Sequence, residues 1–426
     1  MVASTYARLG PSAALKALPR LPTPAYVYDL AEVRRNHALL RAALPEGTGL
    51  YYSLKANPHP GIGRVLAEDG ARAEVCSSGE LAAALDAGWT GARMLYTGPG
   101  KRDAEIRTAL RHGVRQFSVD SPHALDQLDQ LAAETGTSAV ALLRVNDDHP
   151  VPGQGLVMTG TSSQFGADLS WVLAEPERFA GRHRVELAGL HLYMGTNLTE
   201  VEALLDQFAR ALASSRTVAD ALAAHGVRLR ILDLGGGFGA PFARAGATAD
   251  LTALRAPLTA LLDADAPGWR DGTPEVMFES GRYLVGTSGT LLCTVLDVKR
   301  SQGKDVVVLE SGINHLGGNS GLRRLPPLIP QLLHDGEPGE PILDALVTGP
   351  LCTPLDTWNR NAALPALRPG DVVGVPNVGA YGLSASLIGF LGHPLPVEVV
   401  IDGDHPAVPA TCTRLVLNRT TISPQE

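Results

Sequence analysis

The stretch YYSLKAN (residues 51–57) begins the pattern that decides the fold of this chain. Tyr51, Tyr52 and Leu54 suit a buried strand, because aromatic and branched side chains pack well on a sheet. Lys55 follows directly, where burial of its ammonium would be costly. The Lys55 side chain either extends to solvent or is held at this place for its chemistry. We expect the side chain to be buried. Seven similar runs follow; the eight are LYYSL, ARAEV, RMLYT, QFSV, AVALLRV, VELAGLHL, RLRILDL and PEVMF.

Longer amphipathic stretches separate these runs and predict helices. Eight strand–helix units between about residues 30 and 280 predict a TIM (β/α)8 barrel, an α/β fold with a closed parallel sheet. A doubly wound open sheet is the alternative architecture.

After Glu279 the pattern changes to strand-like runs separated by Pro- and Gly-rich turns, which predicts a second, mostly antiparallel β domain. These runs are GTLLCTVLDVK, DVVVLES, ILDALVTG, DVVGVP, VEVVIDG and TRLVLN. The expected parts are an N-terminal segment (1–29) whose YVYDL run joins the β domain, a barrel (30–280) and the β domain itself (281–426). A Gly/Ser/Thr-rich loop at 146–167 is long enough to form a lid.

The composition is that of a globular enzyme, since 45% of the 426 residues are hydrophobic and 19% are charged. The net charge of −8, with no Lys/Arg-rich tract, argues against nucleic acid as a partner. No stretch is long and apolar enough for a membrane span or a secretion signal, so we expect a cytoplasmic protein without a membrane partner. The four cysteines lack metal-binding spacing, and we expect neither disulfides nor a metal site.

Polar residues at the carboxyl ends of the barrel strands are the candidate site residues, because this face holds the active site of TIM barrels. A desolvated lysine such as Lys55 can form a Schiff base with a carbonyl, and pyridoxal phosphate is the common cofactor that uses one. A lysine that merely extends to solvent is the alternative. The residues expected at one mouth are Lys55, Glu74, Arg144, His191, Tyr193, Gly235, Gly236, Gly237 and Glu279.

Two further motifs suit the same cofactor. LDLGGGFG (232–239) follows a strand and exposes consecutive backbone N–H groups that can bind a phosphate. In FESGR (278–282), Glu279 can pair with a protonated pyridine nitrogen and Arg282 with the phosphate. For LDLGGGFG, the alternatives are a simple tight turn and a loose dinucleotide-binding fingerprint, and Pro241 argues against the second. For FESGR, the alternative is a surface ion pair.

In this order, the motifs resemble those of the fold type III pyridoxal-phosphate decarboxylases, the family of diaminopimelate, ornithine and arginine decarboxylases with an alanine-racemase-like barrel. The resemblance covers roughly residues 22–400. It rests on YYSLKAN, EVCSSGEL (74–81), GLHLYMGTN (189–197), GGGFG, FESGR, GPLCTPLD (349–356) and GAYGLSAS (379–386).

The resemblance implies roles for single residues. Lys55 would be the Schiff-base lysine, and Cys352 the proton donor to the carbanion left by loss of CO2. The partner subunit would supply Cys352, so the resemblance implies a homodimer with shared sites. The alternative for Cys352 is that it is a small buried side chain without a catalytic role. The alternative for Tyr381 is that it only packs in the core. The implied cofactor contacts are Lys55, Glu74, His191, Tyr193, Thr196, Gly235, Gly236, Gly237, Glu279, Gly281, Arg282 and Tyr381.

Two positions depart from the best-known members of this family. Thr353 replaces an acidic residue that grips the distal ammonium of diaminopimelate or ornithine, so a substrate with that ammonium would lose a charge pair. Asp356 could compensate for this loss. Tyr193 replaces a histidine stacked on the cofactor ring; its phenol can still stack, and His191 lies on the same strand face.

Tyr193, ESGINHL (310–316), the pair Arg323 and Arg324, CTPLD and GAYGLSAS look most like a subgroup that decarboxylates modified amino acids in secondary metabolism. This subgroup includes the butirosin-pathway enzyme that acts on glutamate attached to an acyl carrier protein. A neutral Thr353 is consistent with an amide or thioester at the distal end of the substrate. The arginine pair would bind a substrate carboxylate or an acidic carrier, or be solvated. The expected substrate contacts are Arg144, Arg323, Arg324, Thr353 and Asp356.

The sequence thus predicts a pyridoxal-phosphate-dependent α-decarboxylase for a free or distally conjugated amino acid in a biosynthetic pathway. One alternative is a diaminopimelate decarboxylase of lysine biosynthesis. Another is an amino-acid racemase, which the GPLC segment argues against. The last is an inactive decarboxylase-like regulator, which retention of Lys55, Arg282, Cys352 and Tyr381 argues against.

Overall fold

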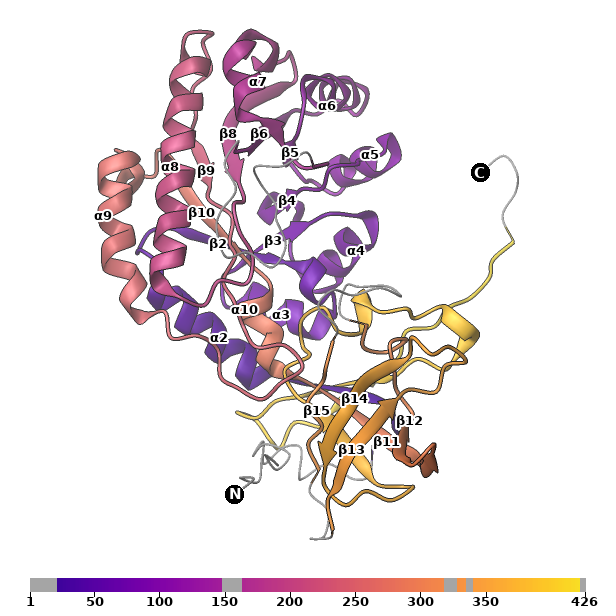
Figure 1. Ribbon diagram of the computed structural model, residues 1–426. Coiled ribbons are helices and arrows are strands. Elements are labelled where there is room, and N and C mark those ends of the chain that lie inside the picture. The colour runs from indigo at the N-terminus through magenta and orange to yellow at the C-terminus, as the bar shows by residue number, and fades with distance from the viewer. Residues whose placement is uncertain (1–20, 148–162, 318–327, 335–339, 422–426) are drawn as a thin grey trace. The chain divides into compact units, whose positions relative to one another are not determined.

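The computed structural model describes residues 21–147, 163–317, 328–334 and 340–421. This part of the chain divides into two compact units (Figure 1). The barrel unit comprises Val33–Ala240 and Ala247–Val285. The β unit comprises the described residues of Met1–Glu32, Pro241–Gly246 and Gly286–Glu426.

Eight parallel strands of the barrel unit close into a barrel, in the order β5-β4-β3-β2-β10-β9-β8-β6, and a β5–β6 pairing completes the ring. All eight strands predicted from the sequence are present, so the TIM-barrel prediction is confirmed and the open doubly wound sheet is excluded. A short strand β7 (Ala167–Asp168) also pairs with β6. The bounds are β2 (Gly49–Ser53), β3 (Arg72–Val75), β4 (Met94–Tyr96), β5 (Gln116–Val119), β6 (Ala139–Asn146), β8 (Val185–Leu192), β9 (Ile231–Asp233) and β10 (Glu275–Ser280).

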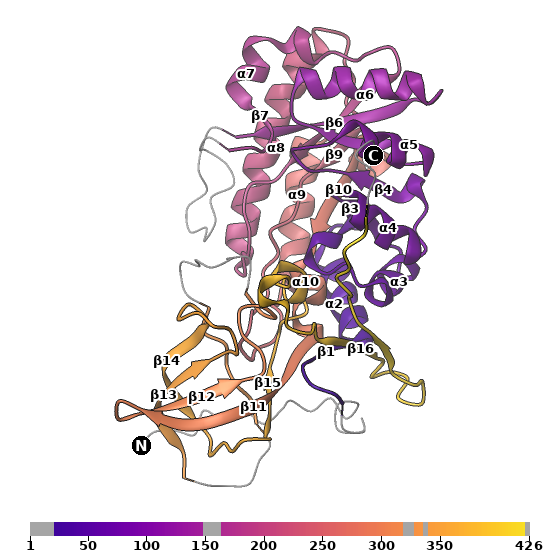
Figure 2. The ribbon, with the colours of Figure 1, turned by 90° about the vertical axis from the view of Figure 1, so that its right-hand side faces the viewer.

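Helices follow the strands and cover the outside of the barrel (Figures 1 and 2). They are α2 (Leu30–Ala43), α3 (Pro60–Glu68), α4 (Ser78–Asp86), α5 (Asp103–Arg111), α6 (Pro122–Glu134), α7 (Leu169–Ala174), α8 (Val201–Ala223), α9 (Arg255–Asp265) and α10 (Arg282–Val285). Short 3-10 helices are η1 (Leu54–Ala56), η2 (Gly91–Arg93), η3 (Pro176–Phe179), η4 (Thr252–Leu254) and η5 (Trp269–Asp271).

Helix α6 illustrates why these segments are helical. The Ser121 hydroxyl accepts a hydrogen bond from the Ala124 N–H, and Pro122 occupies the first turn, where a missing N–H costs nothing. Leu125 and Leu128 recur at helical spacing and are buried against the barrel. The apolar face of the helix therefore holds it against the sheet.

The interior of the barrel is a packed core. Tyr51, Leu95, Leu142, Ile231 and Met277, from five different strands, form one buried cluster. Such layers of side chains are typical of TIM barrels, and they leave the carboxyl ends of the strands as the place for a site.

The β unit contains one sheet in the order β14-β13-β12-β11-β1-β16-β17, with β15 also paired to β11. Its pairings are antiparallel except for β1–β16 and β12–β13. Strand β1 lies between β11 and β16, so the YVYDL run does join this sheet. The strands are β1 (Ala25–Asp29), β11 (Gly289–Ser301), β12 (Lys304–Leu309), β13 (Ile342–Thr348), β14 (Thr357–Leu364), β15 (Val372–Val375), β16 (Val397–Ile401) and β17 (Thr411–Thr413); the short helices are η6 (Gly286–Ser288), η7 (Leu383–Ala385) and η8 (Phe390–Gly392).

Two details of the β unit differ from the sequence prediction. The predicted strand TRLVLN is wrong, because β17 ends at Thr413 and the following Leu415, Val416 and Leu417 are exposed. Strand β14, with the sequence TWNRNAAL, was not predicted. It lies at the sheet edge, where only some of its side chains are buried, so its sequence lacks the regular alternation of a half-buried strand.

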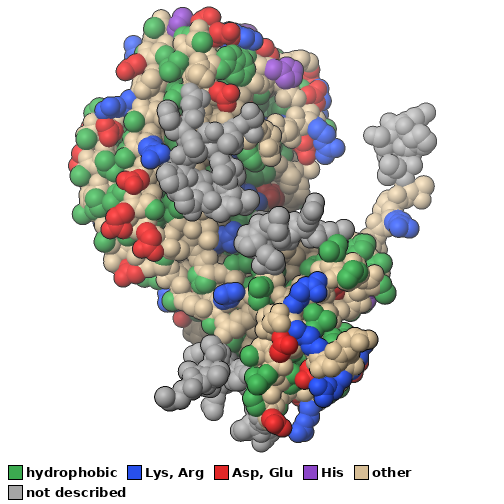
Figure 3. Space-filling view, viewed as in Figure 1, with side chains coloured by type: hydrophobic (Ala, Val, Ile, Leu, Met, Phe, Trp, Pro, Cys, Tyr) green, Lys and Arg blue, Asp and Glu red, His purple; other side chains and the backbone are tan. Residues whose placement is uncertain are grey.

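The surface carries both signs of charge. On the face seen in Figure 3, acidic and basic side chains are interspersed over the barrel unit. Among the described residues, no helix combines the length and the apolarity needed to cross a membrane. Most of the predicted lid loop, residues 148–162, lies outside the described residues.

Candidate active site

Lys55 forms an ion pair with Glu74 at the carboxyl ends of two neighbouring strands. The Lys55 Nζ lies 3.0 Å from Oε1 and 3.1 Å from Oε2 of Glu74. Burial raises the pKa of the Glu74 carboxyl, but the Lys55 ammonium and hydrogen bonds from Ser53, Thr97 and Lys55 outweigh it and lower that pKa to about 2. Glu74 is therefore an ionised carboxylate that holds the lysine in place.

The expected burial of Lys55 is wrong. Strand β2 ends at Ser53, and the turn η1 carries Lys55 out to the rim of the barrel. Its side chain is 39% exposed, whereas that of Glu74 is 2% exposed. Gly281, just after the end of β10, lies close against this turn. A Cβ at Gly281 would lie only 2.8 Å from the Cβ of Ala56, so a larger residue would push the turn away.

Thr97 and Cys76 complete the surroundings of the Glu74 carboxylate. The Thr97 hydroxyl donates to Glu74 Oε1 over 2.6 Å. The Cys76 sulfur lies 3.4 Å from the same oxygen and 3.1 Å from the Thr97 hydroxyl. Burial raises the pKa of the Cys76 thiol, and the Glu74 charge raises it further, so this thiol stays protonated. Thr97 was not identified from the sequence.

The three glycines after β9 are packed too closely for any side chain. A Cβ would lie 2.4 Å from the Leu192 carbonyl oxygen at Gly235, 2.0 Å from the Glu279 carbonyl oxygen at Gly236, and 2.5 Å from a backbone oxygen at Gly237. Gly235 and Gly237 also have φ angles of 65° and 100°, which favour glycine. No helix begins in the described stretch between Phe238 and Leu251, so the dinucleotide-binding alternative is excluded.

Three buried titratable side chains meet below this glycine loop. His191 on β8, Asp233 on β9 and Glu279 on β10 place one polar atom each within 4.8 Å of one another. The His191 Nδ1 lies 2.8 Å from the hydroxyl oxygen of Ser118, and its Nε2 lies 3.2 Å from Glu279 Oε1. Ser118 and Asp233 were not identified from the sequence, although Asp233 lies within the quoted run LDLGGGFG.

Each member of this cluster has a buried atom without a hydrogen-bond partner among the described residues: His191 Nε2, Asp233 Oδ2 and Glu279 Oε1. His191 Nε2 and Glu279 Oε1 are 3.2 Å apart, but they do not form a hydrogen bond. Burial raises the pKa of Asp233 well above its usual value, and the Glu279 charge raises it further. Unpaired buried polar atoms are costly, which points to a ligand with a polar hydrogen or a cation beside Glu279.

Arg144 and Tyr193 form the wall beside this cluster. The Arg144 guanidinium on β6 lies 5.9 Å from the centroid of the Tyr193 ring and 4.7 Å from that of Phe165. A Cβ at Gly235 would lie 3.0 Å from the Tyr193 side chain, so this ring lies against the glycine loop. Thr196 follows in the next turn and is partly exposed, and Arg282 begins the short helix α10.

The remaining predicted site residues belong to the β unit. Cys352 is exposed and Thr353 is partly exposed, in the turns between β13 and β14. Asp356 is buried, and its two carboxylate oxygens each accept a backbone N–H, from Ile313 and Leu351, over 2.9 Å. Tyr381 has a φ of 54°, which is unusual for a residue other than glycine. Arg323 and Arg324 lie outside the described residues.

Comparison with known proteins agrees with this geometry. The family model described as "Pyridoxal-dependent decarboxylase, pyridoxal binding domain" matches residues 30–286. The "L-glutamyl-[BtrI acyl-carrier protein] decarboxylase" of Niallia circulans is 29% identical over 385 residues, which cover 89% of each chain. The diaminopimelate decarboxylase of Pseudomonas aeruginosa is 31% identical over 392 residues, covering 90% of this chain and 89% of that protein.

Solved structures show the same architecture. Diaminopimelate decarboxylase from Helicobacter pylori, complexed with L-lysine, matches with a TM-score of 0.79 at 26% identity, covering 92% of this chain and 94% of that one. A mutant of the enzyme abbreviated SrLDC, in complex with PLP, matches with a TM-score of 0.78 at 26% identity, covering 94% and 97%. The chain belongs to the fold type III pyridoxal-phosphate-dependent decarboxylases, and it is therefore a carboxy-lyase that uses pyridoxal 5'-phosphate.

Proposed function

We propose that the protein removes the α-carboxyl group of an amino acid whose distal end is conjugated, in a biosynthetic pathway of secondary metabolism. One observation carries the choice of substrate. Thr353 is neutral, and the nearby Asp356 is buried with both oxygens engaged by backbone N–H groups. Neither residue offers a free carboxylate to a distal ammonium, so we leave Asp356 out of the proposed substrate contacts and assign it to holding its loop.

The described residues fit pyridoxal phosphate. Lys55 would hold it covalently, with Glu74 keeping the lysine at the rim. The glycine cradle, with Arg282, Thr196 and Tyr381, would hold its phosphate, and Gly281 would keep the nearby turn in place. When bound, the cofactor supplies an electron sink for the pair released as the carboxylate carbon leaves.

The unpartnered Glu279 oxygen would accept the hydrogen of the cofactor's ring nitrogen. In this position the Glu279 carboxylate would pair with the protonated ring nitrogen. We propose that the Ser118 hydroxyl donates to His191 Nδ1, which leaves the imidazole proton on Nε2, facing Glu279. The same donor set of one imidazole and two carboxylates could hold a divalent metal ion instead, and metal analysis of the purified protein distinguishes the two.

Tyr193 would stack on the cofactor ring, with Arg144 behind it and available to a substrate carboxylate. Cys352 would return a proton to the α-carbon after CO2 has left. Its thiol is exposed and so is open to a second subunit, and we propose a cytoplasmic homodimer with shared sites. Arg323 and Arg324 remain proposed contacts for a substrate carboxylate or a carrier protein.

The test is product mass spectrometry in D2O. Free diaminopimelate, ornithine, arginine and lysine are compared with glutamate and diamino acids conjugated at their distal ends, including glutamate on an acyl carrier protein. The proposal expects loss of CO2 with one deuterium gained, confined to the conjugated substrates. Lys55→Ala, which cannot hold the cofactor covalently, is the control for enzyme-independent decarboxylation.

A second candidate substrate is free diaminopimelate, because diaminopimelate decarboxylases are among the relatives of at least 30% identity. Turnover of free diaminopimelate would contradict the conjugated-substrate proposal and place the enzyme in lysine biosynthesis. Deuterium exchange at the α-carbon without CO2 loss would indicate a racemase. Failure to retain cofactor would indicate a regulator.

A further inference from the structure

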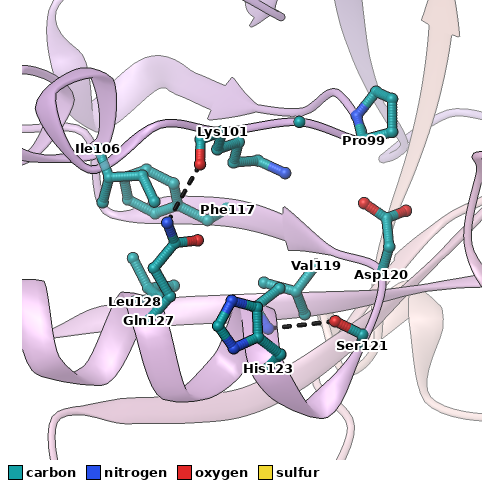
Figure 4. A pocket seen from close by; sticks show the side chains of 12 residues that line it. Pro99, Lys101, Ile106, Phe117, Val119, Asp120, Ser121, His123, Gln127 and Leu128 are labelled. Carbon is teal, nitrogen blue, oxygen red and sulfur yellow. Dashed lines mark hydrogen bonds between the residues drawn. The ribbon is translucent and has the colours of Figure 1, made fainter.

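A separate pocket of about 200 Å3 lies in the barrel unit between helices α5 and α6, beside the carboxyl ends of β4 and β5 (Figure 4). The apolar part of its wall comes from the buried Ile106, Phe117, Val119 and Leu128. The polar side chains of Ser121, His123 and Gln127 line it as well. The volume is below the usual range of about 300–1,000 Å3 for drug-sized ligands. The pocket is therefore suited to a ligand no larger than an amino acid.

Lys101 presents an ammonium to this pocket. Its Nζ donates to the Gly98 carbonyl oxygen over 2.5 Å, and this is its one side-chain hydrogen bond within the described parts of the chain. An ammonium has three N–H donors, so two of them are available. The Lys101 residue is only partly exposed, and its pKa is lowered: burial and the Arg144 charge lower it, and Asp120 and Cys76 offset this only in part. A partly desolvated ammonium with spare donors favours an anionic group at this place.

Asp120 presents the opposite charge to the same pocket. Its Oδ1 accepts the Gly166 N–H over 2.8 Å, and it forms no ion pair with any residue in the described ranges. Figure 4 shows the Lys101 ammonium and the Asp120 carboxylate toward the same end of the pocket, with no hydrogen bond between them. The pocket thus offers one positive group, one negative group and an apolar wall.

We propose that this pocket binds a free α-amino acid with an apolar side chain, at a site distinct from the one that holds the cofactor. Lys101 would bind the α-carboxylate, Asp120 the α-ammonium, and the apolar wall the side chain. The zwitterion is favoured over a simple acid or amine because either of those would leave one of the two charged groups unpaired. Neither Lys101 nor Asp120 belongs to the proposed catalytic set.

Binding is measured by isothermal titration calorimetry on the holoenzyme after treatment with sodium borohydride, which fixes the cofactor to its lysine so that amino acids cannot exchange there. The probes are L-leucine, isopentylamine (the same side chain without the carboxylate) and 4-methylpentanoate (without the ammonium). We expect saturable binding of L-leucine with one site per chain, and at least about tenfold weaker binding of the amine and the acid. This comparison uses the wild-type protein alone.

Two variants locate the site. Lys101→Met keeps the aliphatic part of the side chain, and Asp120→Asn keeps the oxygen that accepts the Gly166 N–H. Each is expected to weaken L-leucine binding by at least about tenfold. Lys299→Met, on the exposed end of β11, removes the same charge and should bind as the wild type does. Thermal unfolding checks that all variants are folded.

Absence of saturable L-leucine binding, equal binding of the acid or the amine, or unchanged binding in both site variants would each overturn the proposal. Its failure is separate from that of the proposed function, since release of CO2 is measured in a different assay that does not depend on this pocket.

Discussion

At the scale of single residues, the site combines one buried carboxylate that has several partners with a buried cluster whose members each have an atom without a partner. The Glu74 carboxylate contacts Lys55, Thr97 and Cys76. The Lys55 ammonium and hydrogen bonds from Ser53 and Thr97 lower its pKa. Asp233 is the opposite case, because its burial raises its pKa and the nearby Glu279 carboxylate raises it further. Two acids in one barrel therefore have pKa values shifted in opposite directions.

Replacement of Thr97 tests the support of Glu74. Thr97→Val keeps the shape of the side chain and removes the hydroxyl that donates to Glu74 Oε1 over 2.6 Å. The loss of a donor to a buried charged group should lower the free energy of unfolding by about 1–3 kcal/mol. Urea unfolding measures the effect, with Thr97→Ser, which retains the hydroxyl, as the control. An unchanged urea midpoint for Thr97→Val would show that this hydrogen bond contributes nothing to stability.

Asp233 leads to a prediction about pH. Its pKa is raised in the folded state, so the folded protein binds more protons than the unfolded chain above a pH of about 4, and stability falls as pH rises. Asp233→Asn removes this dependence. The variant should gain stability relative to the wild type between about pH 5 and pH 8, by at most about 1.4 kcal/mol per pH unit.

Urea unfolding at several pH values measures this difference. The control is Asp263→Asn: Asp263 is exposed, and hydrogen bonds from Arg270 and Trp269 lower its pKa. Asp263 is ionised in both the folded and the unfolded protein above about pH 5, so the difference between this variant and the wild type should not change between about pH 5 and pH 8. If the difference between Asp233→Asn and the wild type is independent of pH, then Asp233 is ionised in the folded protein.

At the scale of elements, strand ends and turns position the site. The turn η1 follows β2 and carries Lys55, and the loop after β9 brings its glycines against the backbone of β10 and of the segment after β8. Helix α10 begins at Arg282, one residue after the end of β10. Lys55, the glycine loop and Arg282 thus lie in the first residues beyond the strands, whereas the buried Glu74, His191, Asp233 and Glu279 lie in the last residues of the strands themselves.

A single methyl group in the glycine loop should disrupt the site. In Gly236→Ala, the new Cβ would lie 2.0 Å from the Glu279 carbonyl oxygen, which is backbone and cannot rotate away. We expect a loss of about 1–3 kcal/mol in stability and weaker binding of pyridoxal phosphate. Thermal unfolding and a fluorescence titration with the cofactor measure these effects. Gly389→Ala, where a Cβ meets no atom within 4 Å, is the matched control; wild-type behaviour of both variants would contradict the close packing.

At the scale of the whole molecule, the predicted site residues are divided between the two units. Lys55, Glu74, His191 and Glu279 belong to the barrel unit, and Cys352 belongs to the β unit. The proposed homodimer would supply Cys352 to the Lys55 of the other subunit. This arrangement can be tested without any structure of the dimer.

Mixing two inactive variants tests the shared site. Lys55→Ala and Cys352→Ala should each lose activity as homodimers. If the sites are shared, a heterodimer of the two has one intact site, so equal mixtures after subunit exchange should regain about a quarter of the wild-type activity. Activity after co-refolding measures this, and sedimentation confirms the dimer. No recovery in a mixture that contains heterodimers would place Lys55 and Cys352 of one site in the same subunit.

The sequence by itself determined the barrel and its eight strands. Eight strand-like runs with helices between them are a local pattern, and each run formed the strand expected. The glycine run and Lys55 were likewise visible, because their chemistry depends on residue type and on their place after a strand. The TRLVLN run failed for the opposite reason: strand propensity needs a neighbouring strand to pair with, and Thr413 is the last residue that has one.

Only the tertiary structure decided how the side chains meet. Ser118 and His191 are 73 residues apart in sequence, and Thr97 and Glu74 are 23 apart, yet each pair is within hydrogen-bonding distance because the closed barrel brings their strands together. The exposure of Lys55, the raised pKa of Asp233 and the engagement of Asp356 by backbone N–H groups also depend on the fold. Burial and distance between residues remote in sequence set these properties, and neither is encoded in any local run of residues.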